Sequence, residues 1–361
     1  MQYRQLGNSS LLISTIGFGA MSLGQGEAEN TRLVDRALDR GINFFDTADL
    51  YEQGENEKKL GRMLKGKRER VVLASKVGNQ LRKDGSGWDW NPQKEYIIKS
   101  VDGSLSRLQT DRIDLYQLHG GTLEDPIDET IEAFEILQQQ GKIRYYGISS
   151  IRPNVIREWV RRSRMVSVMM QYSLLDRRPE ESCLELLKEN HIGVLARGSL
   201  AKGLLAGKPA EVYLDHSREE VEEAARAIQT LSGAHRNAAQ TAIQFVLQHP
   251  AITSAVVGLR TMEQLEGIVA NGTKGEGMER TGMERSGSEP SGSEPSGMEP
   301  SGMERSGIER SGMEKEGLEQ RKSEGEGVKR EAETTEVPAL QEKEINSLFG
   351  KVNANKYELH R

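Results

Sequence analysis

Short apolar stretches alternate along the chain with longer segments in which apolar residues recur at helical spacing. Three of these stretches, residues 42–46, 71–76 and 113–119, end in a polar residue and are bounded by turn-forming residues. Apolar runs of this kind, separated by helical patterns, are typical of buried parallel strands. The same reasoning predicts further strands at 15–19, 143–149, 167–172, 192–196 and 254–258, after a hairpin-like start at 3–14.

Helical periodicity fills the intervals between these strands. In the segment 128–140, the residues Ile131, Phe134 and Leu137 fall on one helical face, and the glycine that follows is a stop signal. Pro92 suits the first turn of the segment 92–108, where its missing N–H is harmless. The other predicted helices span 31–40, 55–65, 153–162, 179–190, 219–231, 238–248 and 262–270. Eight strands interleaved with helices predict an α/β fold in which a parallel sheet closes into a (β/α)8 TIM barrel.

An open, doubly wound sheet is the competing architecture. It would need a glycine fingerprint between the first strand and the first helix. Residues 17–24 contain the first two glycines of that fingerprint but lack the third at the required spacing. We therefore reject the open sheet in favour of the barrel.

A low-complexity segment follows the last predicted barrel helix. Residues 272–328 consist almost wholly of Gly, Glu, Ser, Arg, Lys, Met and Pro, and a five-residue repeat of the type Gly-Met-Glu-Arg-Ser runs from 277 to about 321. Glycine at every fifth position, together with several prolines, cannot sustain a helix or bury a core. We expect a barrel domain at 1–271, a disordered insertion at 272–330 and a C-terminal helix within 331–361 that packs on the barrel. The repeat is either an expansion without chemistry or a weak partner-binding or spacing element.

Composition narrows the class of protein. The hydrophobic content of 35% is low because of the repeat, and the single cysteine excludes an internal disulfide and fits a reducing compartment. No signal peptide is visible at the N-terminus and no apolar stretch reaches the length of a membrane span. The net charge of −6 argues against a nucleic-acid binder. We expect a cytoplasmic protein without nucleic-acid, membrane or obligate protein partners.

Four polar side chains are predicted to meet at the carboxyl ends of the strands, where barrel enzymes keep their active sites. They are Asp46, Tyr51, Lys76 and His119. A free tyrosine is a poor acid at neutral pH, but a nearby ammonium stabilises the phenolate, and an aspartate holds the lysine charged and in place. Such a phenol can donate a proton to a carbonyl oxygen while hydride arrives at carbon, and the histidine can orient that oxygen. The chemistry needs no metal, and the histidines show no metal-ligand spacing.

Several motifs closely resemble those of the aldo-keto reductases. They are DTADLY at 46–51 with Asn-Glu at 56–57, ASK at 74–76, DRIDLYQLH at 111–119 and GKIRYYGIS at 141–149. The resemblance extends from Tyr3 to about Ala270. It implies a (β/α)8 barrel and NADPH-dependent reduction of aldehydes or ketones. It also implies that Tyr51 is the general acid, that Lys76 and Asp46 tune it, and that His119 orients the substrate.

The resemblance further implies a set of cofactor-binding residues. The nicotinamide end would be held by Ala20, Met21, Asp46, Ser149, Ser150 and Gln171, and the residue at Arg197 stands where many members place an aromatic ring against the nicotinamide. The segment 197–208 resembles the pyrophosphate loop, with main-chain N–H groups and lysine side chains meeting phosphate. Its residues are Arg197, Gly198, Ser199, Leu200, Lys202, Gly203 and Lys208.

The adenosine end matches the segment after the last strand, with Gly258, Arg260 and Gln264. Arg260 is a candidate for binding the 2′-phosphate of NADPH through charge-assisted hydrogen bonds, or else is a solvated arginine at a helix start. The family usually presents an Asn, preceded by Glu, four residues past Gln264, whereas this chain has Gly267 and Ile268. Adenine contacts are therefore expected to be weaker.

Trp88 and Trp90 lie in the loop after the third strand, on the catalytic face. We expect them either to form a ring-stacking wall for the substrate, together with Tyr51 and His119, or simply to pack within the loop. The predicted function is therefore NADPH-dependent reduction of a small carbonyl substrate. A nucleotide-binding regulatory protein of the same fold with little turnover is the alternative, and a protein that acts through its repeat is a further one.

Overall fold

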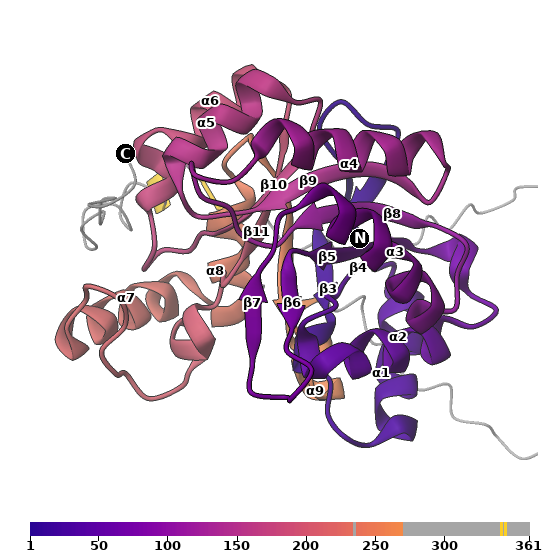
Figure 1. Ribbon diagram of the computed structural model, residues 1–361. Helices are drawn as coiled ribbons and strands as arrows, with labels where there is room; N and C mark the ends of the chain where they lie inside the picture. Colours follow the sequence, from indigo (N-terminus) through magenta and orange to yellow (C-terminus); the bar gives the residue numbers. More distant parts are fainter. Residues whose placement is uncertain (234–235, 270–339, 342, 345–361) are drawn as a thin grey trace, which may run out of the picture. The chain divides into compact units, whose positions relative to one another are not determined.

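The parallel barrel that the sequence predicts is present in the computed structural model, which describes residues 1–233, 236–269, 340–341 and 343–344 (Figure 1). Its strands are hydrogen-bonded in chain order, and the last of them pairs in parallel with the first, so the sheet closes. They are β3 (Ile16–Gly19), β4 (Phe44–Asp46), β5 (Val72–Val77), β8 (Ile113–Leu118), β9 (Ile143–Ser149), β10 (Ser167–Gln171), β11 (Gly193–Arg197) and β12 (Ile252–Gly258). The prediction of a (β/α)8 barrel is confirmed.

Helices surround this sheet in alternation with the strands (Figure 1). They are α1 (Glu27–Asp39), α2 (Glu55–Leu64), α3 (Lys94–Leu108), α4 (Ile127–Gln139), α5 (Pro153–Arg162), α6 (Cys183–Glu189), α7 (Arg218–Leu231), α8 (Ala238–Leu247) and α9 (Met262–Ile268). The predicted place of Pro92 is wrong, because α3 begins at Lys94 after the extended N-cap residue Gln93. The predicted helix at 179–190 is divided into a 3-10 turn, η4 (Arg178–Glu181), and the shorter α6.

Local signals in the sequence explain where several helices begin. Three helices begin with a reciprocal capping box between the N-cap residue and the residue three positions further along the chain. The N-cap residues are Ser217 for α7, Asn237 for α8 and Thr261 for α9. A capping box satisfies two of the backbone N–H groups that a helix start leaves without partners. In α4, Phe134 is fully buried and its ring stacks on that of Tyr146 at a centroid distance of 5.5 Å. These contacts fix the helices against the outside of the barrel.

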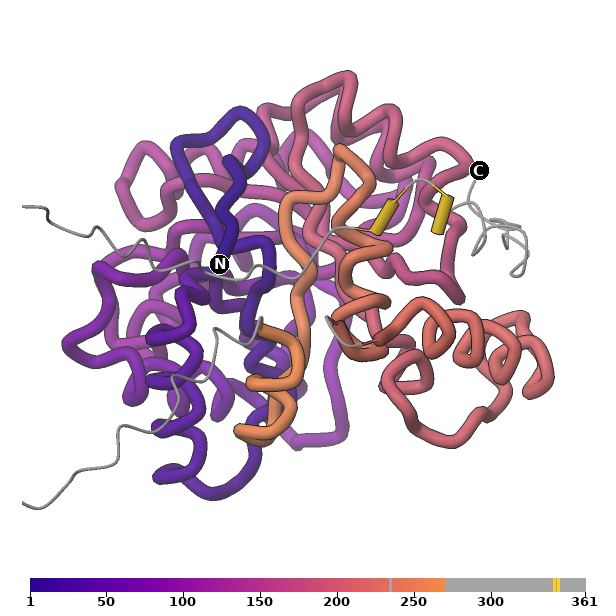
Figure 2. The backbone as a smooth tube through the Cα atoms, turned by 180° about the vertical axis from the view of Figure 1, so that it is seen from behind, coloured from indigo at the N-terminus to yellow at the C-terminus, as the bar shows by residue number. Residues whose placement is uncertain are grey.

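The apolar core has two parts. The larger part lies between the strands and the surrounding helices, and the smaller part gathers side chains such as Phe44, Leu115 and Leu195 from the strands. The N-terminal hairpin, β1 (Tyr3–Gln5) and β2 (Leu12–Ser14), adds Leu6, Leu11 and Ile13 to this smaller cluster. Figure 2 shows this hairpin, in indigo, from behind. Gly7 in its turn lies against the Val166 carbonyl and the Gly193 amide, at the amino ends of β10 and β11, so the hairpin leaves the carboxyl ends of the strands uncovered.

A second hairpin, β6 (Asn79–Leu81) and β7 (Trp88–Trp90), follows β5 and forms a separate two-stranded antiparallel sheet (Figure 1). The sequence predicted only a loop here. Its strands pair Asn79 with Trp90 and Leu81 with Trp88. Both tryptophans therefore lie on β7, in the loop region that follows the third barrel strand.

Little of the C-terminal part belongs to the described residues. Leu340 is buried in the larger core, and its carbonyl accepts a hydrogen bond of 2.6 Å from the Gln248 side chain. Glu344 forms an ion pair with Arg236. The predicted insertion at 272–330 and most of the predicted helix in 331–361 lie outside the described residues. No helix within the part of the chain that the structure describes is long and apolar enough to cross a membrane.

Candidate active site

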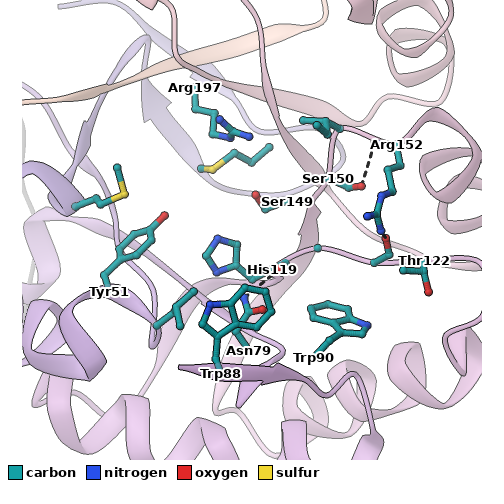
Figure 3. Close-up of a pocket in the computed structure, with 16 residues that line it drawn as sticks. Tyr51, Asn79, Trp88, Trp90, His119, Thr122, Ser149, Ser150, Arg152 and Arg197 are labelled. Carbon is teal, nitrogen blue, oxygen red and sulfur yellow. Dashed lines mark hydrogen bonds between the residues drawn. The ribbon is translucent and has the colours of Figure 1, made fainter. Parts of the chain in front are cut away.

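The four residues predicted to carry the chemistry come together at the carboxyl end of the barrel. The Lys76 ammonium lies at the centre: its Nζ donates to Asp46 Oδ2 at 2.7 Å and to the Thr47 carbonyl at 2.7 Å, and it lies 3.3 Å from the Tyr51 hydroxyl. The rings of Tyr51 and His119 meet edge to face at a centroid distance of 5.8 Å. Figure 3 shows these two rings on the same side of one cavity. Asp46 and Lys76 lie beneath, almost wholly buried.

The charge of Lys76 is set by two opposing effects. Burial lowers the pKa of its ammonium, but the negative charge of Asp46, followed by the interaction with Tyr51, outweighs burial, and the net pKa of Lys76 is raised. The side chain therefore remains positively charged at neutral pH. A fixed cation next to a phenol favours the transfer of the phenolic proton.

The segment that carries Tyr51 is held by buried polar contacts. Thr47 Oγ1 lies 2.7 Å from Asn56 Oδ1, and Asn56 Nδ2 donates to the Ala20 carbonyl at 2.9 Å. The Asp49 amide donates to the Lys76 carbonyl at 3.3 Å. The start of α2 is thereby tied to the loop after β3, and the segment before Tyr51 is tied to strand β5. These ties position the tyrosine relative to the lysine.

A second set of ionisable groups lies behind Lys76. Glu57 is fully buried, accepts from Ser75 Oγ and pairs with Arg107 Nε at 2.7 Å. Burial, followed by repulsion from Glu57, raises the pKa of Asp49 to about 7. Asp49 Oδ1 has no hydrogen-bond partner among the described residues. This carboxyl group is thus poised to hold a proton near neutral pH.

The backbone directly after Tyr51 adopts a left-handed conformation without glycine. Glu52 and Gln53 have φ values of 48° and 56°. Non-glycine residues in this region cost roughly 1–2 kcal/mol each. The Glu52 carboxylate pairs with Lys59 at 2.9 Å, which ties the strained turn to α2. The strain directly follows Tyr51, and strained backbone of this kind is common at functional sites.

His119 is neutral in this environment. Burial, then the charges of Lys76 and Arg197, lowers the pKa of its imidazole from 6.5 to about 3. Its amide donates to the Val77 carbonyl at 2.7 Å, and its carbonyl accepts from Asn79 Nδ2 at 3.3 Å. Its Nδ1 has no partner among the residues that the structure describes. A neutral imidazole has one N–H to donate and one nitrogen to accept, so it can orient a carbonyl oxygen without competing as an acid.

A cavity of about 720 Å³ opens above Tyr51 and His119 (Figure 3). Trp88 and Trp90 are among the residues that line this cavity, which agrees with the first of the two roles considered for them from the sequence. Trp90 is fixed in place, because its Nε1 donates to Asp125 Oδ1 at 2.8 Å and its ring lies against Gly78 and Gly120. The lining comprises Met21, Leu50, Tyr51, Asn79, Trp88, Trp90, His119, Gly120, Gly121, Thr122, Ser149, Ser150, Ile151, Arg152, Met169 and Arg197.

The predicted nicotinamide-binding residues are divided between this cavity and the protein beneath it. Met21, Ser149, Ser150 and Arg197 line the cavity, whereas Ala20 is fully buried below it. Gln171 lies just outside the lining, and its Oε1 accepts from Arg197 Nη1 at 2.8 Å. Strand-end hydroxyl groups therefore line the same cavity as Tyr51, with the Gln171 amide just outside it. Their donor and acceptor types fit a carboxamide.

Apart from Arg197, which ends β11 and lines the cavity, the predicted pyrophosphate loop lies after β11 and outside the cavity lining. It contains the 3-10 turn η5 (Ala201–Ala206), preceded by Gly198, Ser199 and Leu200. Gly198 and Gly203 have φ values of 73° and 94°, and a Cβ at Gly203 would lie 2.9 Å from the Lys208 side chain. Ser199 Oγ is buried without a partner among the described residues, and Lys202 and Lys208 are exposed. This combination of tight backbone and cations fits the phosphates of a dinucleotide.

At the predicted adenosine end, the polar groups engage one another. Arg260 Nε donates to the Ser22 carbonyl at 3.2 Å, and Gln264 Oε1 accepts from the Arg260 amide at 2.8 Å as part of the cap of α9. Gly258 approaches Ser22 so closely that a Cβ there would lie 2.3 Å from its Oγ. Ile268 is buried in the larger core. This packing explains why position 268 offers no polar group to adenine.

The cavity also contains residues that the sequence did not single out. They are Leu50, Asn79, Gly120, Gly121, Thr122, Ile151, Arg152 and Met169. Most lie within a few residues of a barrel-strand end, and only that position in the sequence could have suggested them. Within the described part of the chain, no group of three or more His, Cys, Asp or Glu side chains is arranged to hold a metal ion.

Comparison with known proteins agrees with this geometry. The model of the Aldo/keto reductase family matches residues 15–274. The uncharacterized oxidoreductase YqkF of Bacillus subtilis (strain 168) is 49% identical over 274 residues, which cover 73% of this chain and 89% of that protein. The structure of the aldo-keto reductase AKR11C1 from Bacillus halodurans, in its holo form, is similar to this one, with a TM-score of 0.77 and a sequence identity of 39%. The match covers 100% of this chain and 99% of the AKR11C1 chain. The aldo-keto reductase yakc [NADP(+)] of Schizosaccharomyces pombe is 34% identical over 56% of this chain and 62% of its own length.

Proposed function

Since the chain belongs to the aldo/keto reductase family and is an oxidoreductase, we propose that it reduces aldehyde or ketone carbonyls to alcohols with NADPH. One observation carries the proposal. The Lys76 ammonium links Asp46 to the Tyr51 hydroxyl, and a neutral His119 faces the same cavity. An acid, a fixed cation and a hydrogen-bonding imidazole around one space are the groups that carbonyl reduction requires.

NADPH would be held by the strand-end residues Ser149, Ser150 and Gln171, by the loop 197–208 and by Arg260. The donor types fit a carboxamide, two phosphates and a 2′-phosphate in that order along the chain. The name of the S. pombe relative supports the choice of NADP over NAD. When bound, NADPH supplies a hydride to the carbonyl carbon.

The residues of this chain would act on the carbonyl oxygen. Tyr51 donates its proton to that oxygen as negative charge develops on it, and the Lys76 ammonium stabilises the phenolate that remains. His119 donates a hydrogen bond to the same oxygen and so fixes the orientation of the substrate. Asp46 holds Lys76 charged throughout, because the pair stays buried and hydrogen-bonded.

The decisive experiment compares the wild type with Tyr51→Phe. NADPH binding is measured by fluorescence, and NADPH oxidation is followed with a panel of aldehydes, methylglyoxal and quinones. The variant should bind NADPH normally and lose turnover by about 100-fold or more, because general acid catalysis is worth 10²–10⁴-fold. Turnover that survives in Tyr51→Phe would refute the assigned acid. Binding without turnover in the wild type would instead favour the nucleotide-binding regulatory protein.

A further inference from the structure

The lining of the cavity above Tyr51 carries more positive than negative charge. It contains two guanidinium groups, Arg152 and Arg197, and no carboxylate among the described residues. The Lys76 ammonium beneath is neutralised by its contact with Asp46. Figure 3 shows both arginines among the residues around the cavity, with the Arg152 side chain directed toward the loop at Thr122. A cavity with this charge favours an anionic occupant.

Arg197 has a neutral partner. Its Nη1 donates to the side-chain oxygen of Gln171 at 2.8 Å, and within the described residues it forms no ion pair. Its field reaches the reaction centre, because it contributes, after burial and Lys76, to the low pKa of His119. The charge of Arg197 is therefore felt where the substrate carbonyl would lie.

Arg152 also donates to a neutral group, the Gly121 carbonyl. It is the N-cap of α5, and the first turn of that helix contains no acidic residue, so the helix dipole adds to its positive charge. Two acidic residues lie in the loop before α4. The pKa of the exposed Glu124 carboxyl group is lowered by hydrogen bonds to its backbone and to Thr122 and, to a smaller extent, by the charge of Arg152. Asp125 is occupied: it accepts from Trp90 Nε1 and from both the amide and the hydroxyl of Thr122. Asp125 does not line the cavity.

Another part of the cavity wall is aromatic. Trp90 is held rigidly between Gly78, Gly120 and Asp125, whereas Trp88 is 47% exposed. Rigid aromatic surface of this kind binds flat or apolar groups. The cavity thus presents an aromatic wall, a cationic wall and the reactive hydroxyl of Tyr51 around one space.

On the basis of the carbonyl reduction proposed above, we propose that this cavity selects carbonyl substrates that carry a carboxylate on a flat or apolar body. Arg152 binds the carboxylate, the tryptophans contact the body, and the carbonyl lies at Tyr51 and His119. The carboxylate is chemically unchanged by the reaction. Its binding gives Arg152 an oppositely charged partner in place of a neutral carbonyl, and a guanidinium and a carboxylate can pair through two parallel hydrogen bonds.

The test uses two aldehydes of nearly equal shape, 4-carboxybenzaldehyde and the neutral 4-carbamoylbenzaldehyde, at saturating NADPH. The wild type should show a kcat/KM at least tenfold higher for the carboxylate. Arg152→Met should remove most of this preference, lowering kcat/KM for the carboxylate about 10- to 100-fold, mainly through KM, and changing kcat/KM for the neutral aldehyde far less. Arg157→Met is the matched control, because Arg157 is exposed on the same helix. It should change neither value.

Binding is measured separately from turnover. The alcohols 4-(hydroxymethyl)benzoate and 4-(hydroxymethyl)benzamide are titrated while the fluorescence of Trp88 and Trp90 is followed. Equal affinity of the wild type for the two alcohols, or a preference that Arg152→Met leaves intact, would overturn the anion site. A carboxylate preference in binding without turnover of either aldehyde would keep the anion site and refute the proposed reduction. Unchanged NADPH affinity in Arg152→Met establishes that the variant is folded.

Discussion

Asp49 gives the sharpest link between this structure and a measurable property. Its side chain is 7% exposed and lies behind Lys76, near Glu57 and Arg107. Burial, followed by repulsion from Glu57, raises its pKa from 3.8 to about 7. At about 1.4 kcal/mol per pKa unit, the shift corresponds to roughly 4 kcal/mol between the protonation states. We predict that Asp49→Asn, which mimics the protonated carboxyl group, makes the protein more stable at alkaline pH.

The direction follows from proton binding. The folded protein holds the Asp49 proton up to about pH 7, whereas the unfolded chain releases it near the ordinary pKa of 3.8. Between these values the folded state binds the extra proton, so the free energy of unfolding falls as the pH rises. The stabilisation that this retained proton provides is fully present below the pKa of Asp49 in the unfolded chain. It is lost as the pH rises through the pKa of Asp49 in the folded protein. The opposite effect of His119, whose folded pKa is lowered, is shared by both proteins and cancels in their difference.

The assay is urea denaturation of the wild type and Asp49→Asn from about pH 5 to about pH 8. The variant should gain stability relative to the wild type by roughly 3 kcal/mol over this range, most of it below pH 7. Asp39→Asn is the control, because the Asp39 side chain is 63% exposed, and its profile should run parallel to that of the wild type. A profile of Asp49→Asn that also stays parallel would show that the buried carboxyl group does not take up a proton on folding.

Two further predictions concern the cavity wall and the cofactor. Gly78→Ala should cost about 1–3 kcal/mol of stability beyond Gly66→Ala, because both glycines have positive φ but only a Cβ at Gly78 meets the Trp90 ring, at 2.8 Å. Urea denaturation measures both variants, and equal losses would mean that Trp90 moves aside at no cost. Arg260→Ala should weaken NADPH binding by about tenfold or more and leave NADH binding unchanged, because only NADPH carries a 2′-phosphate. Equal weakening of both cofactors in a fluorescence titration would exclude the assigned phosphate contact.

The barrel could be predicted from the sequence because each strand and helix carries a local signal. The strand at 143–149 coincides with β9 and the helix at 153–162 with α5. The start of α3 was misplaced because a tertiary contact competes with the local preference: the Pro92 carbonyl accepts a hydrogen bond of 2.7 Å from Thr130 at the start of α4. Proline tolerates the first helical turn, but the sequence does not reveal which partner its carbonyl finds.

The meeting of Asp46, Tyr51, Lys76 and His119 could be predicted because motifs and strand ends mark these residues. Arg152 could not, because the local sequence does not reveal that its side chain donates to the Gly121 carbonyl or that Asp125 is occupied by Trp90 and Thr122. The hairpin β6–β7 was also missed. Its strands are only three residues long, and alternation over so short a run does not distinguish a strand from a loop. Properties that depend on which distant side chains meet stay hidden from local patterns.

The hairpin β6–β7 has a consequence for how this enzyme can change over generations. Its two strands pair only with each other, so residues 82–87 at its tip contribute no hydrogen bonds to the barrel ladder. Insertions, deletions or random substitutions there alter the aromatic rim without shifting the register of any barrel strand. A library randomised at these positions would therefore diversify substrate choice while most of its members still fold. The protein carries, beside its catalytic machinery, a segment on which laboratory selection can act with little penalty.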